Sequence, residues 1–247
     1  MCTKKAYYEN LIKVAKAPRK YQLTDVLLET LSIIAYKQPI TKLEIEKIRG
    51  ESEERRVAPW DVAFYSHKLK LRKYNIDAEM LRPYFELNRV INGVFGLANR
   101  LYGITFKENK EIPVYHPDVK AYEVFDKDGS YLAVLLTDFH PRSSKQGGAW
   151  MTSYKGQWKD PQTGENSRPH VSLVMNFSKP TKEKPALLTF GEVETFLHEF
   201  GHSLHEIFAN TTYQSLSGTN VYWDFVELPS QFMENFATQK EFLHTFA

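Results

Sequence analysis

Two histidines one helical turn apart, with a glutamate between them, constrain this chain more than any other feature. Residues 198–202 are His-Glu-Phe-Gly-His, and on a helix this spacing places His198 and His202 on one face. Two imidazoles so placed suit one tetrahedral zinc ion, with the carboxylate of Glu199 beside it. Glu227, later in the chain, offers a third ligand. The pattern predicts one Zn²⁺ held by His198, His202 and Glu227, with Glu199 as general base.

The residues around this motif predict an amphipathic helix over about 191–209. Its apolar side chains recur at helical spacing and gather on about a third of the helical wheel: Val193, Phe196, Leu197, Phe200, Leu204, Ile207 and Phe208. The two histidines and Glu199 lie outside this stripe, so the stripe can pack on a core while the histidines face a cleft. Gly201 weakens a helix, which is tolerable where another backbone or a substrate approaches closely.

Four nearby residues each have an alternative interpretation. His205 competes as a third ligand, but three histidines in one helical run cannot easily surround one ion, so a supporting or surface role is favoured. Asp224 caps the next helix, which we favour, or supports a metal ligand. Glu234 is expected to be structural rather than catalytic. Pro229 indicates that the next helix begins or bends near Glu227.

The remaining patterns predict a mainly α-helical fold with a small β-sheet. Helices are expected over 24–36, 41–50, 77–103 and 224–243, and strands over 122–125, 131–136 and 171–177. Lys127-Asp128-Gly129 predicts a hairpin turn between the first two strands. Strand 171–177 is either an edge that pairs with an extended peptide or an ordinary sheet strand. The loop 146–150 is either a close-approach loop or a plain turn. The polar residues 51–56 look like a linker at the end of a helix–turn–helix-like N-terminal segment, residues 1–56, and a second domain is expected over residues 57–247.

Composition limits the remaining functions. The chain has 247 residues, a formal net charge of +2 and a single cysteine, Cys2. Cys2 cannot form an internal disulfide, and cysteine-based zinc sites are excluded. The small net charge does not indicate nucleic acid as the main partner. No apolar run is long enough to cross a membrane and no signal peptide is visible, so a cytoplasmic protein is expected.

From about residue 57 onward the chain resembles the M3 family of zinc metallopeptidases. Residues 196–205, 217–221 and 224–231 carry the resemblance, and residues 82–90 and 112–119 look most like its peptidyl-dipeptidase branch. The resemblance implies a zincin-type core, one zinc ion and release of C-terminal dipeptides from short peptides. It also implies His198, His202 and Glu227 as ligands and Glu199 as base.

The chain departs from the family pattern in three places. Trp223 stands where members usually have arginine. The family's Gly- and Tyr-rich segment, with transition-state-stabilising residues, and its large N-terminal helical portion are not in this sequence, so a truncated, weakly active or inactive core is expected. Residues 21–50 instead resemble the winged-helix region of segregation and condensation protein B. A foreign segment over residues 1–56, from a fused or misassembled reading frame, is the favoured interpretation, and a bifunctional protein is the alternative.

The sequence therefore predicts zinc-dependent hydrolysis of short peptides, with water activated on the metal and Glu199 as base. The alternative is a catalytically incomplete fragment or interaction module whose partial winged helix binds protein or DNA. The sequence does not indicate an oligomeric state.

Overall fold

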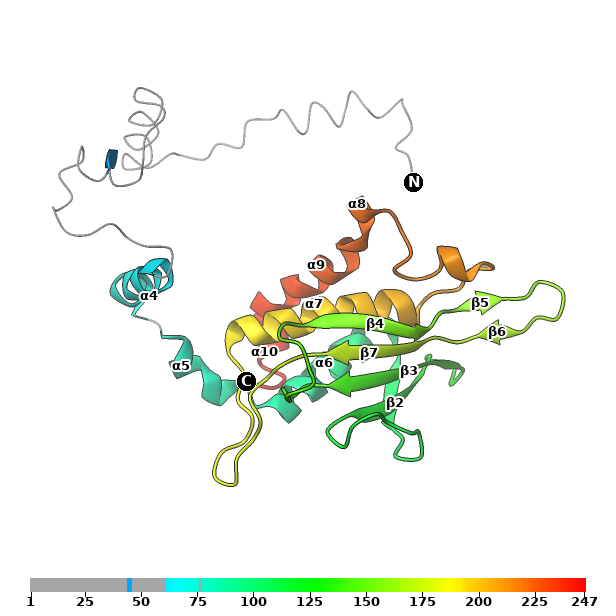
Figure 1. Cartoon of the computed structure of the whole chain (residues 1–247), viewed down its shortest axis with the longest axis horizontal. Coiled ribbons are helices and arrows are strands. Elements are labelled where there is room, and N and C mark those ends of the chain that lie inside the picture. Colours follow the sequence, from blue (N-terminus) through cyan, green and yellow to red (C-terminus); the bar gives the residue numbers. More distant parts are fainter. Residues whose placement is uncertain (1–43, 46–60, 76) are drawn as a thin grey trace. The chain divides into compact units, whose positions relative to one another are not determined.

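The computed structural model describes residues 44–45, 61–75 and 77–247, which fall into two units, 1–73 and 74–247 (Figure 1). In the first unit, Glu44 and Ile45 are helical. This unit also contains helix α4 (Asp61–Tyr74) up to Lys73. Lys68 Nζ lies 4.6 Å from the centre of the Phe64 ring on this helix. Apart from residues 44 and 45, the predicted helices over 24–36 and 41–50 and the predicted linker lie outside the described residues.

The second unit contains a small mixed sheet with strand order β1-β2-β3-β7-β4. These strands are β1 (Thr105–Glu108), β2 (Lys120–Phe125), β3 (Tyr131–Asp138), β7 (His170–Val174) and β4 (Trp150–Lys155). β3 and β7 run parallel, and the other neighbours pair antiparallel. The predicted hairpin is confirmed, with Gly129 in its turn at a φ of 84°. A separate two-stranded ribbon joins β5 (Trp158–Lys159) and β6 (Asn166–Ser167).

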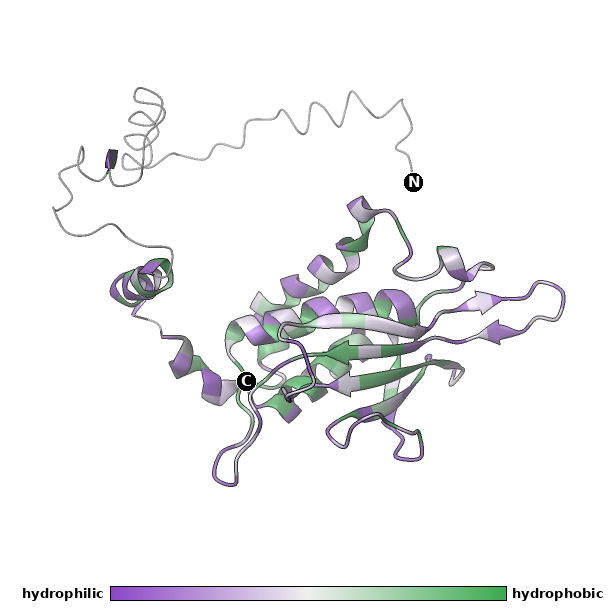
Figure 2. Ribbon diagram, viewed as in Figure 1, coloured by the Kyte–Doolittle hydropathy of each residue, from purple (hydrophilic) through white to green (hydrophobic). Residues whose placement is uncertain are grey.

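Helices cover one face of this sheet and enclose the main core (Figure 2). Helix α6 (Leu87–Tyr102) and helix α7 (Phe190–Ile207) contribute much of its buried surface. Phe196 and Phe200 of α7 are fully buried, and Phe196 packs edge-on against Phe139 at 5.2 Å between ring centres. A smaller apolar cluster is formed by Val119, Ala121, Val134 and Leu136. Helices with a small mixed sheet agree with the predicted fold class. Among the described residues, no helix has the length and hydropathy of a membrane span.

The prediction of one continuous helix over 77–103 is wrong, because the helix is interrupted over residues 82–86. The segment forms three pieces: α5 (Ala78–Leu81), the 3₁₀ turn η2 (Arg82–Tyr84) and α6. Pro83 in η2 has no N–H to donate to a continuing helix. The chain then pairs with a distant segment, because the Leu87 N–H donates to the Ala186 carbonyl at 2.9 Å and the Leu188 N–H donates to the Phe85 carbonyl at 2.8 Å. These long-range bonds replace the helical bonds that local periodicity predicts.

Candidate metal centre

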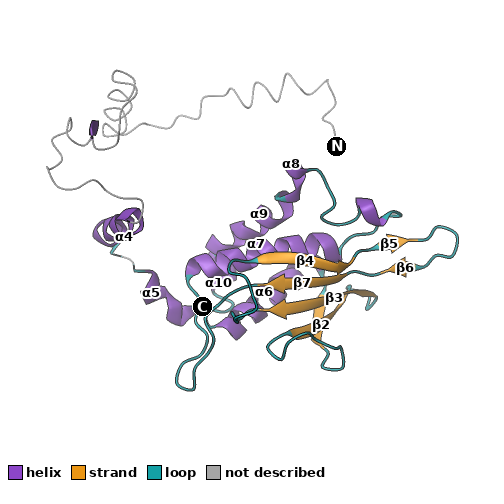
Figure 3. Ribbon diagram, viewed as in Figure 1, coloured by secondary structure: helices purple, strands orange, loops and turns teal. Residues whose placement is uncertain are grey.

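Helix α7 runs along the sheet (Figure 3), and its predicted histidine pair lies outside the residues that it buries in the core. Its start is fixed by a capping box, in which the Thr189 hydroxyl accepts from the Glu192 N–H and the Glu192 carboxylate accepts from the Thr189 N–H. The predicted apolar stripe is buried in the core except for Phe208, which is 38% exposed. His198 and His202 remain partly accessible, with 25% and 12% of their side-chain surface exposed.

The second predicted helix, over 224–243, is broken into short pieces: α8 (Trp223–Val226), α9 (Leu228–Glu234), the 3₁₀ turn η4 (Asn235–Thr238) and α10 (Lys240–Leu243). Glu227 is the N-cap of α9, and Pro229 lies in its first turn, where a missing N–H is harmless. The predicted start near Glu227 is confirmed. The predicted cap role of Asp224 is wrong, because Tyr222 is the N-cap of α8 and no side chain caps that end.

Helices α7 and α9 approach each other closely at Gly201. A Cβ atom at this position would lie 2.6 Å from the Pro229 carbonyl oxygen and 2.6 Å from Ser230 Cα. The expectation that another backbone passes close to Gly201 is therefore confirmed. This approach brings the start of α9, with Glu227, against the histidine-bearing face of α7.

The three candidate ligands converge on one point. Their donor atoms lie within 4.8 Å of one another. Glu227 Oε2 is 3.3 Å from His198 Nε2 and 3.1 Å from His202 Nε2. Two donors that are each about 2.0–2.1 Å from a tetrahedral zinc ion are separated by roughly 3.3 Å. The donor set and its spacing therefore fit zinc.

Two further residues support these donors. Glu234 Oε1 lies 2.5 Å from His198 Nδ1, on the side of the ring opposite Glu227. The Ser230 hydroxyl donates to Glu227 Oε2 at 2.8 Å, and this hydrogen bond holds the pKa of Glu227 below its ordinary value. A carboxylate on the second nitrogen of a metal-binding histidine fixes the orientation of the ring. Sequence reasoning did not connect Glu234 to His198, although its place two helical turns after Glu227 is a usable signal.

The candidate base, Glu199, lies beside the triad in a pocket of about 380 Å³. Burial raises the pKa of Glu199 above its ordinary value, and the nearby Glu227 carboxylate adds to this rise. His198 and a hydrogen bond from the Met151 backbone act in the opposite direction. A carboxyl group with a raised pKa is better suited to accept and return a proton near neutral pH.

One wall of this pocket is strand β4, not the strand predicted to pair with a peptide. β7, which overlaps the predicted strand 171–177 over residues 171–174, lies between β3 and β4 and has both sides paired, so the ordinary-strand interpretation holds. β4 is the last strand of the described sheet, and Trp150 and Met151 line the pocket. The position of a free edge depends on pairing between distant strands, which local patterns do not contain.

The loop before β4 leaves its two glycines uncovered by other described residues. Space around Gly147 and Gly148 is open, and Gly148 has a φ of +99°. The Asn176 side chain donates to the Gln146 and Gly148 carbonyls at 2.9 and 2.7 Å. No described residue approaches these two glycines, and approach by a substrate is not tested, so both interpretations of residues 146–150 stay predictions.

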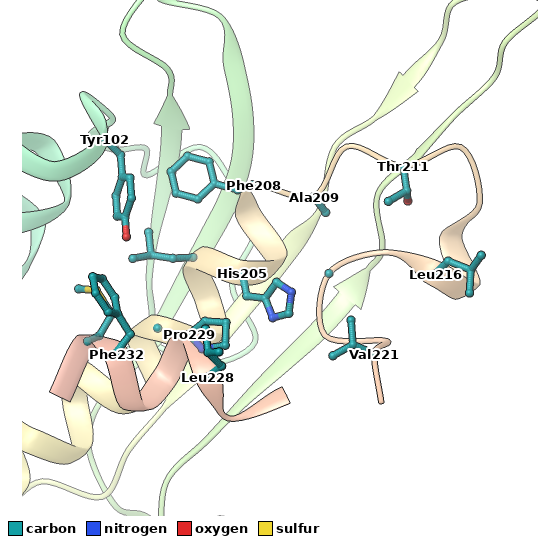
Figure 4. A pocket seen from close by; sticks show the side chains of 14 residues that line it. Tyr102, His205, Phe208, Ala209, Thr211, Leu216, Val221, Leu228, Pro229 and Phe232 are labelled. Atoms are coloured by element: carbon teal, nitrogen blue, oxygen red, sulfur yellow. The ribbon is translucent and has the colours of Figure 1, made fainter. Parts of the chain in front are cut away.

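His205 lies away from the triad. It lines a different, largely apolar pocket of about 490 Å³, together with Phe208, Leu228 and Phe232 (Figure 4). Burial lowers the pKa of His205, and its Nδ1 atom has no hydrogen-bond partner among the described residues. His205 does not join the group of His198, His202 and Glu227.

A family model for peptidase family M3 matches residues 8–247. The chain belongs to this family. M3 peptidases are zinc-dependent metallopeptidases, and His198, His202 and Glu227 form a possible metal-binding triad in this member. The match includes residues 21–50, which also resemble a different family. That second resemblance concerns residues outside the described ones and stays a prediction.

Curated relatives support the family. The chain is 47% identical to dipeptidyl carboxypeptidase of Escherichia coli over 190 residues, which is 76% of this chain and 27% of the relative. It is 38% identical to oligopeptidase A of Escherichia coli over 242 residues, or 96% of this chain and 35% of the relative. Saccharolysin of Saccharomyces cerevisiae is 36% identical over 71% of this chain and 26% of its own length. The chain thus spans about a third or less of the length of these relatives.

Proposed function

We propose that this chain carries the catalytic centre of a zinc-dependent peptidase that hydrolyses short peptides. In this proposal His198, His202 and Glu227 hold the ion and Glu199 is the general base. The observation that carries the proposal is the spacing of the donor atoms. His198 Nε2 and His202 Nε2 lie 3.3 and 3.1 Å from Glu227 Oε2, and the buried carboxyl group of Glu199 lies beside them.

The chemistry follows from these positions. When bound, zinc lowers the pKa of a coordinated water to about 7 and polarises a peptide carbonyl. Glu199 lines the same pocket as the triad, so its carboxylate accepts the proton of the attacking water. The protonated Glu199 then returns that proton to the leaving amine of the cleaved peptide. Glu234 holds the His198 ring in the tautomer that presents a free Nε2 to the metal.

The substrate lies along β4 in this proposal. The outer edge of β4 can add an extended peptide as a further strand, with main-chain hydrogen bonds giving affinity. Trp150 and Met151 place that edge at the pocket that contains Glu199. Similarity to a dipeptidyl carboxypeptidase supports release of C-terminal dipeptides as the specific reaction.

Zinc content and turnover test the proposal together. The purified chain, stripped with a chelator and reloaded at neutral pH, should hold one zinc per chain, and His202→Ala should not. A blocked tetrapeptide should be cleaved, and Glu199→Gln should lower the rate by about 10²-fold or more while keeping zinc.

Glu194→Gln is the matched control, because Glu194 is an exposed glutamate on the same helix. It should behave as the unchanged chain. A chain that never retains stoichiometric zinc refutes the proposed metal site. Cleavage that persists in Glu199→Gln refutes the assigned base.

A further inference from the structure

Glu206 is a buried carboxylate on α7 that the proposed reaction does not use. Only 1% of its surface is exposed, and it lies one turn beyond His202 toward the C-terminal end of the helix. A buried carboxylate is unfavourable unless hydrogen bonds satisfy its oxygens. Its partners therefore indicate what the residue does.

The two carboxylate oxygens of Glu206 join two segments that are far apart in sequence. Oε1 accepts a hydrogen bond from the Ser153 hydroxyl of β4 at 3.0 Å. Oε2 accepts one from the Thr219 N–H at 3.1 Å, in the loop after the 3₁₀ turn η3 (Gln214–Leu216). The Ser153 hydroxyl also lies 3.2 Å from the Lys155 carbonyl, where the register of β4 against β7 shifts.

The loop is fitted closely around this carboxylate. A Cβ atom at Gly218 would lie 1.8 Å from Glu206 Oε2, and Gly218 has a φ of +56°. Glycine alone suits both the contact and this left-handed backbone conformation. The fit places the neighbouring Thr219 N–H on the carboxylate.

Both tethered segments are walls of the candidate metal pocket. Thr219 of the loop and Met151 of β4 both line this pocket. Met151 is two residues before Ser153, so both side chains lie on the same face of β4. Glu206 itself touches neither His198, His202 nor Glu227 among the hydrogen bonds and ion pairs of the described residues. It can thus affect the distance between the walls without altering the donors.

We infer that Glu206 is a positioning residue that sets the separation between the β4 edge and the Thr219 loop, and with it the width of the peptide-binding cleft. The inference rests on the proposed function, because it assigns the peptide to the space between these walls. Removing the carboxylate should release both walls and weaken peptide binding, with zinc binding preserved.

The test measures peptide affinity by fluorescence anisotropy with labelled tetra-alanine, in zinc-loaded chains that all carry Glu199→Gln. Glu206→Ala removes both tethers and should raise the peptide Kd by about tenfold or more. Glu206→Gln keeps an acceptor for Thr219 and can donate to Ser153, so its Kd should stay within about threefold of the parent. The zinc content of both variants should equal that of the parent.

Two serine variants give a matched comparison if Glu206→Ala does not fold. Ser153→Ala removes only the β4 tether and should raise the peptide Kd by about three- to tenfold. Ser203 is a buried serine on α7 whose hydroxyl donates to the Glu199 backbone carbonyl at 3.0 Å, and among the described residues it has no side-chain hydrogen bond to either wall. Ser203→Ala should therefore leave the Kd unchanged.

Hydrogen–deuterium exchange separates positioning from a purely structural role. Faster exchange at residues 150–155 and 217–221, together with a raised peptide Kd, supports the inference. The inference is overturned if the walls loosen while the peptide Kd stays that of the parent, or if Ser153→Ala and Ser203→Ala bind peptide alike. A parent chain that takes up no zinc or no peptide refutes the proposed function itself, which is a distinguishable result.

Discussion

Replacing Gly201 with alanine tests whether the approach of α7 and α9 builds the metal centre. The added Cβ would lie 2.6 Å from two backbone atoms of the Pro229–Ser230 segment, where an ordinary contact needs at least 3.4 Å. Neither neighbour is a flexible side chain, so the start of α9 must move away by about 0.8 Å. Glu227 lies at this start and must move with it.

The expected cost can be worked from this displacement. Overpacking of this kind destabilises by about 1–3 kcal/mol, and contact with rigid backbone places Gly201→Ala at the upper end. Alanine offsets up to about 1 kcal/mol through its better helix propensity. A net loss of about 2 kcal/mol should lower the melting temperature by about 4–8 °C in a chain of this size. Because Glu227 is displaced, zinc affinity should fall by about tenfold or more.

Thermal denaturation and competitive zinc titration against a chromophoric chelator measure both effects. Gly191→Ala is the control, because Gly191 is an exposed glycine on the same helix with open space around it. It should leave zinc affinity unchanged and stability equal or slightly higher. If Gly201→Ala matches the unchanged chain in melting temperature and zinc affinity, the close approach does not control the site and the reasoning fails.

Two further substitutions test other parts of the structure. Glu234→Ala removes the partner of His198 Nδ1 and should weaken zinc binding by about 10–100-fold; an unchanged zinc titration would contradict this role. Burial raises the pKa of Asp138, but hydrogen bonds from Arg142 and Lys145 outweigh burial and hold it below its ordinary value. This carboxylate therefore stabilises the fold above about pH 4 and loses that effect as pH falls through its lowered pKa. Asp138→Asn should destabilise by about 3–5 kcal/mol at pH 7 and show a shallower fall in stability on acidification, measured by urea unfolding from pH 7 to pH 3.

Local sequence information predicted those features whose causes are local. The amphipathic helix at 190–207, the hairpin around Gly129 and the start of a helix near Pro229 follow from periodicity, turn residues and the missing proline N–H. A close backbone at Gly201 is one of the two explanations that the sequence offers for a glycine there, the other being a closely approaching substrate. His198 and His202 likewise follow from spacing on one helix, whereas Glu227 comes from the start of the next helix pair, at the N-cap of α9.

Features that depend on distant partners were missed. The break before α6 is stabilised by bonds to residues 186 and 188, which no local pattern around Pro83 reveals. The free edge falls on β4 because β7 pairs with β3 on its other side, across a crossover in the chain. The hydrogen bond between Ser153 of β4 and Glu206 of α7 likewise depends on how the sheet packs against α7.

The geometry of the metal centre therefore depends on the packing of α9 against α7, because residues at the two ends of α9 contact the two ring nitrogens of His198. The first residues of α9 bring Glu227 to His198 Nε2, and its last residue brings Glu234 to His198 Nδ1. A shift of α9 disturbs both contacts at once. The losses in zinc affinity caused by Gly201→Ala and Glu234→Ala should then be less than additive in the double variant, since the first change already weakens the contact that the second removes. Strict additivity would instead mean that Glu234 follows His198 independently of the helix packing.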